Sequence, residues 1–193
     1  MIHVDLANEP PAFDSTVRAP GRAWLSSHPD ALVSAMPDYW RRCANAMLEG
    51  YARVCAYSSL YIPPVTGADT VEHVAPKSKH RDLAYEWSNY RLVCSLMNAR
   101  KRDFEDVLDP FEIDDGLFHL DLGEGQVMAD PALPAATRKQ VIATIERLKL
   151  DDPECRTARR EYYLAFQAGD IGPEYLRTHC PFVALEATRQ GLM

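Results

Sequence analysis

The pattern of apolar and polar positions predicts an irregular arm followed by a helix. Residues 1–36 are rich in proline, serine and aspartate and carry only short apolar spots. This composition is typical of an irregular arm that lies across a domain surface and contains one short helix. Over 37–53 the apolar side chains recur at helical spacing. Pro37 and Asp38 stand at the start of this segment, where a helix accepts proline and favours an acid.

The middle of the chain predicts two strands, a polar loop and a helix. The segment 55–64 is apolar and aromatic and ends in two prolines, and 70–74 is a short β-like run. The residues between them have the composition of a turn, so an antiparallel hairpin is the simplest interpretation. A polar loop follows, and apolar residues at helical spacing then predict a helix over 87–101.

The last part of the chain predicts a second hairpin and three helices. Apolar and polar residues alternate over 118–122, and two glycines supply a turn before the run 126–128. The expected helices cover 134–150, 153–168 and 173–190. The fold class that we expect is α+β. We divide the chain into an N-terminal arm, a core, and a mainly helical C-terminal extension with one hairpin, packed on the core: 1–36, 37–108 and 109–193.

Composition is that of an ordinary globular protein. The 193 residues are 47 % hydrophobic and 25 % charged. No apolar run approaches the roughly 18 residues of a membrane span, and the N-terminus lacks the basic start and apolar stretch of a signal peptide. The five cysteines are odd in number and widely spread, which argues against a disulfide scaffold. We expect a cytoplasmic, reduced protein.

Charge is distributed unevenly along the chain. The net charge of −7 argues against a binder that holds nucleic acid nonspecifically through general positive charge. Residues 71–102, however, contain seven lysine or arginine and three acidic residues, which gives +4, whereas the remainder carries 14 basic and 25 acidic residues, which gives −11. The basic stretch is therefore a candidate contact surface for an anion, and a solvated helix face with a lysine-rich loop is the alternative.

An acid and a histidine at the end of the expected strand are the first candidates for chemistry. Glu72 and His73 stand there, and Asn98 lies in the expected helix, so the three converge if the hairpin packs against the helix. Carboxylate and amide oxygens suit Mg²⁺ or Mn²⁺, which also keep waters and a phosphate as ligands. A neutral histidine beside such an ion can take a proton from an attacking water. Together these groups would support metal-assisted phosphodiester hydrolysis.

The same residues resemble a known family. The sequences EHVAPKS and EWSNYRLVCSLMNARK resemble the HNH endonucleases, in the variant whose third signature residue is asparagine and whose fold is ββα-metal. The matching positions are His73, Asn89 and Asn98, with Glu72 before the first and Lys101 after the last. The sequences are also similar to HNH partner proteins of bacterial anti-phage systems of the Septu and retron-associated type. The resemblance covers about 55–102.

The resemblance implies a role for each matching residue. His73 would be the general base that activates water, and Asn89 would tie the loop to the helix start so that the imidazole is aimed correctly. Glu72 and Asn98 would hold one divalent ion, Mg²⁺ or Mn²⁺, against the scissile phosphate. On charge and position alone, we expect five further side chains to contact phosphates: Lys77, Lys79, Arg91, Arg100 and Lys101.

The chain departs from the family at the zinc knuckles. Many members carry two Cys-x-x-Cys pairs that bind a structural zinc, and the corresponding positions here are Cys55 with Ser58 and Cys94 with Met97. Two thiolates with a serine and a methionine make a poor tetrahedral zinc site. We expect no structural zinc, with Cys55, Cys94 and Met97 packed as apolar core. Glu72 is a second departure, because aspartate is common at this position.

The function that we expect is metal-dependent hydrolysis of nucleic acid phosphodiesters, with DNA favoured over RNA. The resemblance adds an anti-phage role and an ATPase as a protein partner, and it leaves a homo-oligomer open; no membrane contact is expected. The alternative is a catalytically inactive HNH-like module that binds a protein or nucleic acid. A chance match in an unrelated α+β protein is the remaining reading, and in that case Glu72, His73 and Asn98 need not lie together.

Overall fold

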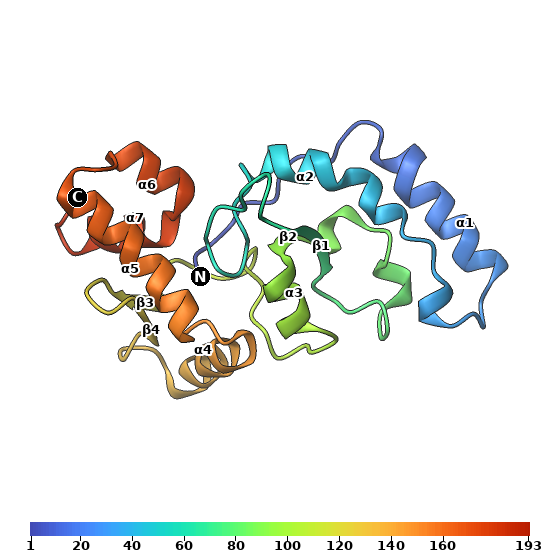
Figure 1. Ribbon diagram of the computed structural model, residues 1–193. Helices are drawn as coiled ribbons and strands as arrows, with labels where there is room; N and C mark the ends of the chain where they lie inside the picture. Colours follow the sequence, from blue (N-terminus) through green and yellow to red (C-terminus); the bar gives the residue numbers. More distant parts are fainter.

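Helices dominate the fold, and two small antiparallel sheets interrupt them (Figure 1). The computed structural model describes all 193 residues and contains seven α-helices and two two-stranded sheets. The expected α+β class is therefore confirmed. None of the helices combines the length and the apolarity that a membrane crossing requires.

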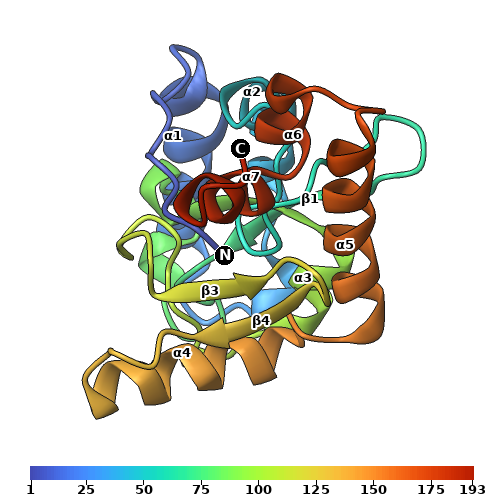
Figure 2. The same ribbon diagram turned by 90° about the vertical axis from the view of Figure 1, so that its left-hand side faces the viewer.

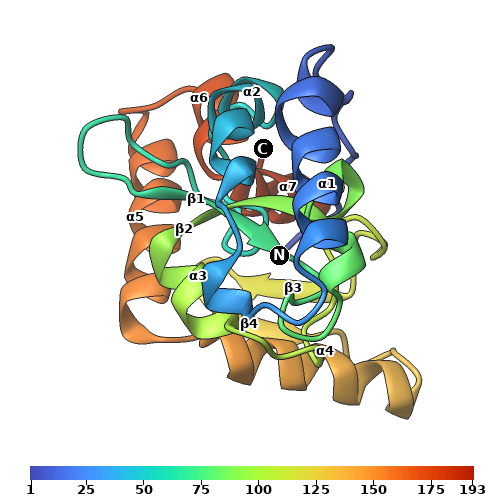
Figure 3. The same ribbon diagram turned by 90° about the vertical axis from the view of Figure 1, so that its right-hand side faces the viewer.

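The N-terminal arm is more helical than its composition indicates. A π-helical turn, Asp14–Arg18, leads into α1, Ala19–Ser27, which lies along one end of the molecule (Figures 1 and 3). This helix packs closely on the loop beyond β1: a Cβ on Gly21 would lie 2.2 Å from a ring carbon of Tyr85. A larger side chain at that position would separate the arm from the core, so the glycine is required by packing.

The helix expected over 37–53 is shorter and less regular than its apolar spacing indicates. It begins as a 3-10 segment, Tyr39–Cys43, and continues as α2, Ala44–Gly50. Ala52 and Arg53 then adopt positive φ angles of 47° and 60°, which end the helix. Met47 is completely buried beneath α2 and anchors it to the core.

The central unit is a strand, a strand and a helix, but its strands are not the ones expected. β1, Asp69–His73, pairs antiparallel with β2, Tyr90–Cys94, and α3, Ser95–Lys101, follows directly. The predicted hairpin between 55–64 and 70–74 is therefore wrong, as is the helix over 87–94.

Both errors have a physical origin. Four of the five β2 residues, Tyr90 to Val93, are buried, so this run has no polar face whose period distinguishes a strand from a helix. The segment 55–64 forms only an isolated bridge, between Val54 and Tyr61, and its final prolines lack the N–H that a ladder needs.

The C-terminal extension follows its apolar pattern closely. β3, Phe118–Asp121, and β4, Gln126–Ala129, form the expected hairpin, and α4, Ala135–Leu148, and α5, Pro153–Ala168, confirm two of the three helices (Figure 2). The third is divided into α6, Pro173–His179, and α7, Pro181–Arg189. Pro181 causes the break because it disfavours helical geometry at Cys180, whose φ is −146°.

One hydrophobic core joins the arm, the central unit and the extension. It contains 34 buried residues, drawn from Met1 to Ala187. Arg91 supports this junction from β2: it makes two hydrogen bonds to the Asp109 carboxylate, at 2.7 and 2.5 Å, and its guanidinium lies 3.5 Å from the centre of the Phe111 ring. Only 3 % of the Arg91 side chain and 12 % of the Asp109 side chain is exposed.

Removal of Asp109 should therefore destabilise the fold strongly. We expect Asp109→Ala to lower the free energy of unfolding by roughly 3 kcal/mol, because it leaves a buried guanidinium without its counter-charge. Asp106→Ala is the matched control, since Asp106 pairs with Arg147 at the surface and its loss should cost about 1 kcal/mol or less. Denaturant unfolding of both variants measures the difference, and equal effects would contradict the junction role of Arg91.

Candidate active site

The end of β1 and the start of α3 bring the three predicted chemical side chains to one cavity. Thr70 and Glu72 share a face of β1 because alternate residues of a strand point the same way. Asn98, one turn into α3, donates its amide N–H to Thr70 Oγ1 at 3.0 Å and thereby fixes the helix to that face. Glu72, His73 and Asn98 all line a cavity of about 460 Å³.

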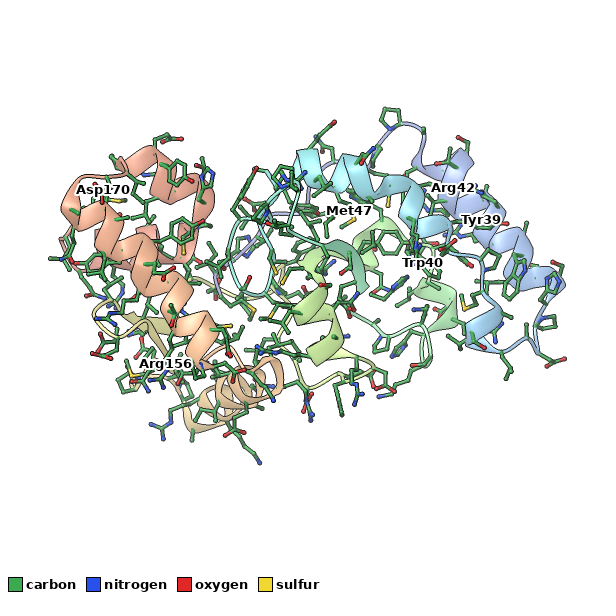
Figure 4. All side chains as sticks on the ribbon, in the orientation of Figure 1. Tyr39, Trp40, Arg42, Met47, Arg156 and Asp170 are labelled. Atoms are coloured by element: carbon green, nitrogen blue, oxygen red, sulfur yellow. The ribbon has the colours of Figure 1, made fainter.

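The ring of His73 is held in one orientation. It is buried, and its Nε2 lies 2.9 Å from Ala84 O; because a carbonyl only accepts, Nε2 carries the hydrogen. Nδ1 is left with its lone pair. The rings of Trp40 and Tyr90 pack nearly perpendicular to the imidazole, with centroids at 4.9 and 5.1 Å, and Figure 4 shows Trp40 on the segment before α2.

The surroundings of His73 keep its ring neutral. Burial lowers the pKa of His73 to about 3, the positive charge of Lys77 acts in the same direction, and the hydrogen bond to Ala84 opposes both. A neutral ring with a free Nδ1 has the lone pair that a general base needs, but a pKa of about 3 makes it a weak base unless a nearby negative charge raises that pKa. The ring is therefore prepared as a base in its orientation and its tautomer.

Asn89 connects the loop between the strands to the start of β2. Its Oδ1 accepts a hydrogen bond from Ala75 N at 2.8 Å, and its Nδ2 donates to Ala75 O and Leu83 O at 3.1 and 3.0 Å. All three contacts are to backbone, and Leu83 precedes Ala84, whose carbonyl holds His73. Asn89 thus acts on the imidazole through the loop and does not enter the cavity lining.

Lys101 is placed beside Glu72 and does not itself line the cavity. Its ammonium lies 3.0 Å from Glu72 Oε1 and donates to His73 O and Val74 O at 3.1 and 2.9 Å, so all three donors are used. Lys101 is completely buried. Burial raises the pKa of Glu72 to about 6, because it outweighs the opposing charge of Lys101.

The oxygen donors present fit a hard divalent cation. Asn98 uses its amide N–H on Thr70, which leaves Oδ1 free, and Lys101 contacts only Oε1 of Glu72. Two protein oxygens beside a cavity with room for waters and a phosphate match the ligation of Mg²⁺ or Mn²⁺. The structure contains no group of three or more histidine, cysteine, aspartate or glutamate side chains that could hold a metal by themselves.

Of the five expected phosphate contacts, the structure brings only Lys77 to the cavity lining, with its ammonium 5.0 Å from the Trp40 ring centre. Lys79 pairs with Glu105 at 2.7 Å at the surface. Arg100 binds Asp152 at 2.6 Å together with the carbonyls that end α4. Arg91 and Lys101 are both buried and pair with Asp109 and Glu72, so neither is available to contact a phosphate.

The structure adds residues to the site that the motif did not indicate. Trp40 and Arg41 line the cavity from the 3-10 segment, Val33 from the arm, and Arg102 from the residue after α3. Arg102 has a positive φ of 52°, which ends the helix at the cavity edge. No spacing links 33–41 to 72–102 in the sequence, so only the packing of the arm reveals these contributions.

Two of the three expected packing positions are confirmed among Cys55, Cys94 and Met97. Cys55 and Met97 belong to the hydrophobic core, and Cys94 is half-buried against it. The lack of a structural zinc stays a prediction.

Neither a comparison with protein-family models nor a search of curated proteins finds a match for this chain.

The tautomer and charge of His73 can be observed directly. We expect ¹⁵N NMR to show a neutral ring with hydrogen on Nε2 at pH 5, because burial favours the uncharged form and Ala84 O accepts that hydrogen. The folded-state pKa lies below the ordinary 6.5, so the unfolded state binds more protons between these values. The free energy of unfolding is therefore not reduced by His73 titration above pH 6.5, and this titration lowers it as the pH drops from 6.5 towards about 3. A charged ring at pH 5, or hydrogen on Nδ1, would contradict this assignment.

Proposed function

We propose that the protein is a metal-dependent endonuclease of the HNH type, which hydrolyses phosphodiester bonds in nucleic acid, with DNA favoured over RNA. The observation that carries the proposal is the placement of His73. Its ring is fixed by Ala84, with Nδ1 free, in the same cavity as the oxygens of Glu72 and Asn98. A binding scaffold has no need for a neutral, oriented imidazole beside two cation ligands.

The chain's own groups supply the proton transfer and the orientation. His73 Nδ1 takes a proton from a water that attacks the phosphorus, and the Nε2–H bond to Ala84 keeps the ring in place as it becomes charged. The negative charge of a substrate phosphate would offset Lys77 and so act to raise the pKa of His73, against the larger effect of burial. A divalent ion on Glu72 and Asn98 would offset the charge that develops on the phosphate and the leaving oxygen.

The charge around the cavity supports a weak, local contact with nucleic acid. Arg41, Lys77 and Arg102 line the cavity, together with Glu72 and Asp103, in a protein of net charge −7. Few phosphates can be neutralised by such a surface, so intrinsic affinity should be low. We therefore include in the proposal a partner that delivers the substrate; by analogy alone this is an ATPase, in an anti-phage role.

A catalytically inactive module is the second candidate, and the Lys101–Glu72 pair favours it. The ammonium lies 3.0 Å from the carboxylate that would bind the cation, and both side chains are buried. A lysine in this position can substitute for the metal's charge and hold the fold without one. The two functions differ in nucleic acid cleavage and in the affinity of the cavity for Mn²⁺.

Cleavage of plasmid DNA, linear DNA and RNA tests the proposal. With Mg²⁺ or Mn²⁺ we expect wild-type cleavage that His73→Ala reduces at least about 100-fold, because a positioned general base contributes about that much. His119→Ala is the matched control: His119 Nε2 lies 2.9 Å from a carboxylate oxygen of Asp130, and the residue is on β3, outside the cavity lining. Cleavage that survives in His73→Ala would contradict the base.

Mn²⁺ binding, measured by electron paramagnetic resonance, separates the two candidates when cleavage is not seen. The nuclease proposal expects one Mn²⁺ per chain, with binding lost in Glu72→Gln and retained in His119→Ala. A folded wild type that binds no Mn²⁺ would favour the inactive module.

A further inference from the structure

Cys55 and Cys94 lie next to each other although 39 positions separate them in the sequence. Their sulfur atoms are 3.9 Å apart, and the backbone N–H of Cys94 donates to Cys55 Sγ at 3.4 Å. Ala56 N also donates to Leu92 O at 2.8 Å, so the chain at Cys55 runs beside β2. Neighbouring strands lie about 5 Å apart, which is within the Cα separation of roughly 4.4–6.8 Å that a disulfide spans.

The surroundings of the pair make one sulfur more acidic than the other. Burial opposes ionisation of Cys55, but hydrogen bonds from the Cys94 thiol, Ser58 and the backbone together outweigh it and lower the pKa of Cys55. The hydrogen bond to Cys55 and burial raise the pKa of Cys94. A thiolate beside a protonated thiol is the arrangement in which one sulfur attacks an oxidant and the second resolves the product.

The pair borders a cavity on the face of α3 away from the candidate active site, with Cys94 half-buried and 1 % of Cys55 exposed. Cys55 and Cys94 line a cavity of about 210 Å³ with Met97, whereas Asn98 faces the other cavity. Cys155 also lines the smaller cavity, but its sulfur contacts the Arg100 guanidinium at 3.8 Å and neither of the other sulfurs. Cys43 and Cys180 are buried elsewhere in the core.

We propose that Cys55 and Cys94 form a dithiol modification site that peroxide oxidises to a disulfide. The Cys55 thiolate attacks one peroxide oxygen, the O–O bond breaks, and the hydroxide that leaves takes a proton from solvent to become water. Cys55 is then a sulfenic acid. The Cys94 thiol loses its proton as its sulfur attacks Cys55 Sγ, the S–O bond breaks, and a second water leaves. Two thiols and one peroxide give one disulfide and two waters.

The cross-link would tether the core segment whose buried polar side chains lack hydrogen-bond partners. Tyr57 OH and Ser59 Oγ are buried without hydrogen-bond partners, and Ser59 has a positive φ of 54°. A disulfide joins this segment to the junction of β2 and α3 and restricts the unfolded chain. We expect oxidation to raise the melting temperature by about 5–10 °C.

The experiment uses the reduced full-length chain and an equimolar amount of hydrogen peroxide. Mass spectrometry of the intact protein should show a loss of two hydrogens, about 2 Da, and non-reducing digestion should show a Cys55–Cys94 peptide pair. In Cys94→Ser the melting temperature should not rise, whereas Cys155→Ser, from the same cavity, should behave as wild type. Circular dichroism of each reduced variant confirms that it is folded.

A second probe tests the pair without oxidation. Phenylarsine oxide binds two adjacent thiols, so we expect one arsenical per wild-type chain and per Cys155→Ser chain, and none on Cys94→Ser. Sulfinic acid at Cys55 with Cys94 still free, a disulfide through Cys155, or equal arsenical binding by all three proteins would each overturn the proposal. None of these outcomes depends on nuclease activity.

Discussion

The buried ammonium of Lys101 is the contact on which the arrangement of the site depends. It comes from the last residue of α3 and joins that helix to the end of β1 through Glu72 and the carbonyls of His73 and Val74. Burying a lysine is costly unless every donor is satisfied, and here all three donors are. The strand that carries Glu72 and His73 and the helix that carries Asn98 are thereby locked in one relative position, which a site built from separate elements requires.

The loop between β1 and β2 determines the orientation and the tautomer of the His73 ring. Asn89 bonds only to backbone, and the carbonyl of Ala84, next to its partner Leu83, accepts from both His73 and Tyr90. The loop therefore fixes a tautomer, and burial fixes the charge. The arm and the 3-10 segment complete the arrangement, because Val33 lines part of the cavity and Trp40 packs on the imidazole. The contacts that orient the His73 ring also stabilise the fold, so substitutions at these residues should affect both activity and stability.

The sequence predicted which side chains share a cavity better than it predicted the strands. Glu72, His73 and Asn98 were expected to converge if a hairpin packed against the helix, and they line one cavity although the strand that pairs with β1 is β2. Asn89 was expected to position the loop, and its side chain bonds only to backbone there. The pairing of β1 with β2 was missed, since Tyr90 to Val93 are all buried and show no period. The roles of Arg91, Arg100 and Lys101 were also out of reach, because their partners, Asp109, Asp152 and Glu72, are defined only by folding.

Chemical rescue tests the role of His73 most directly. His73→Gly leaves a space bounded by Trp40 and Tyr90 in which imidazole from solution can take the place of the lost ring. We predict that nucleic acid cleavage by this variant is restored by added imidazole and that its rate follows the concentration of the neutral form as pH is raised. A variant that stays inactive at high imidazole concentration, while the wild type cleaves, would contradict the assignment of His73 as the base.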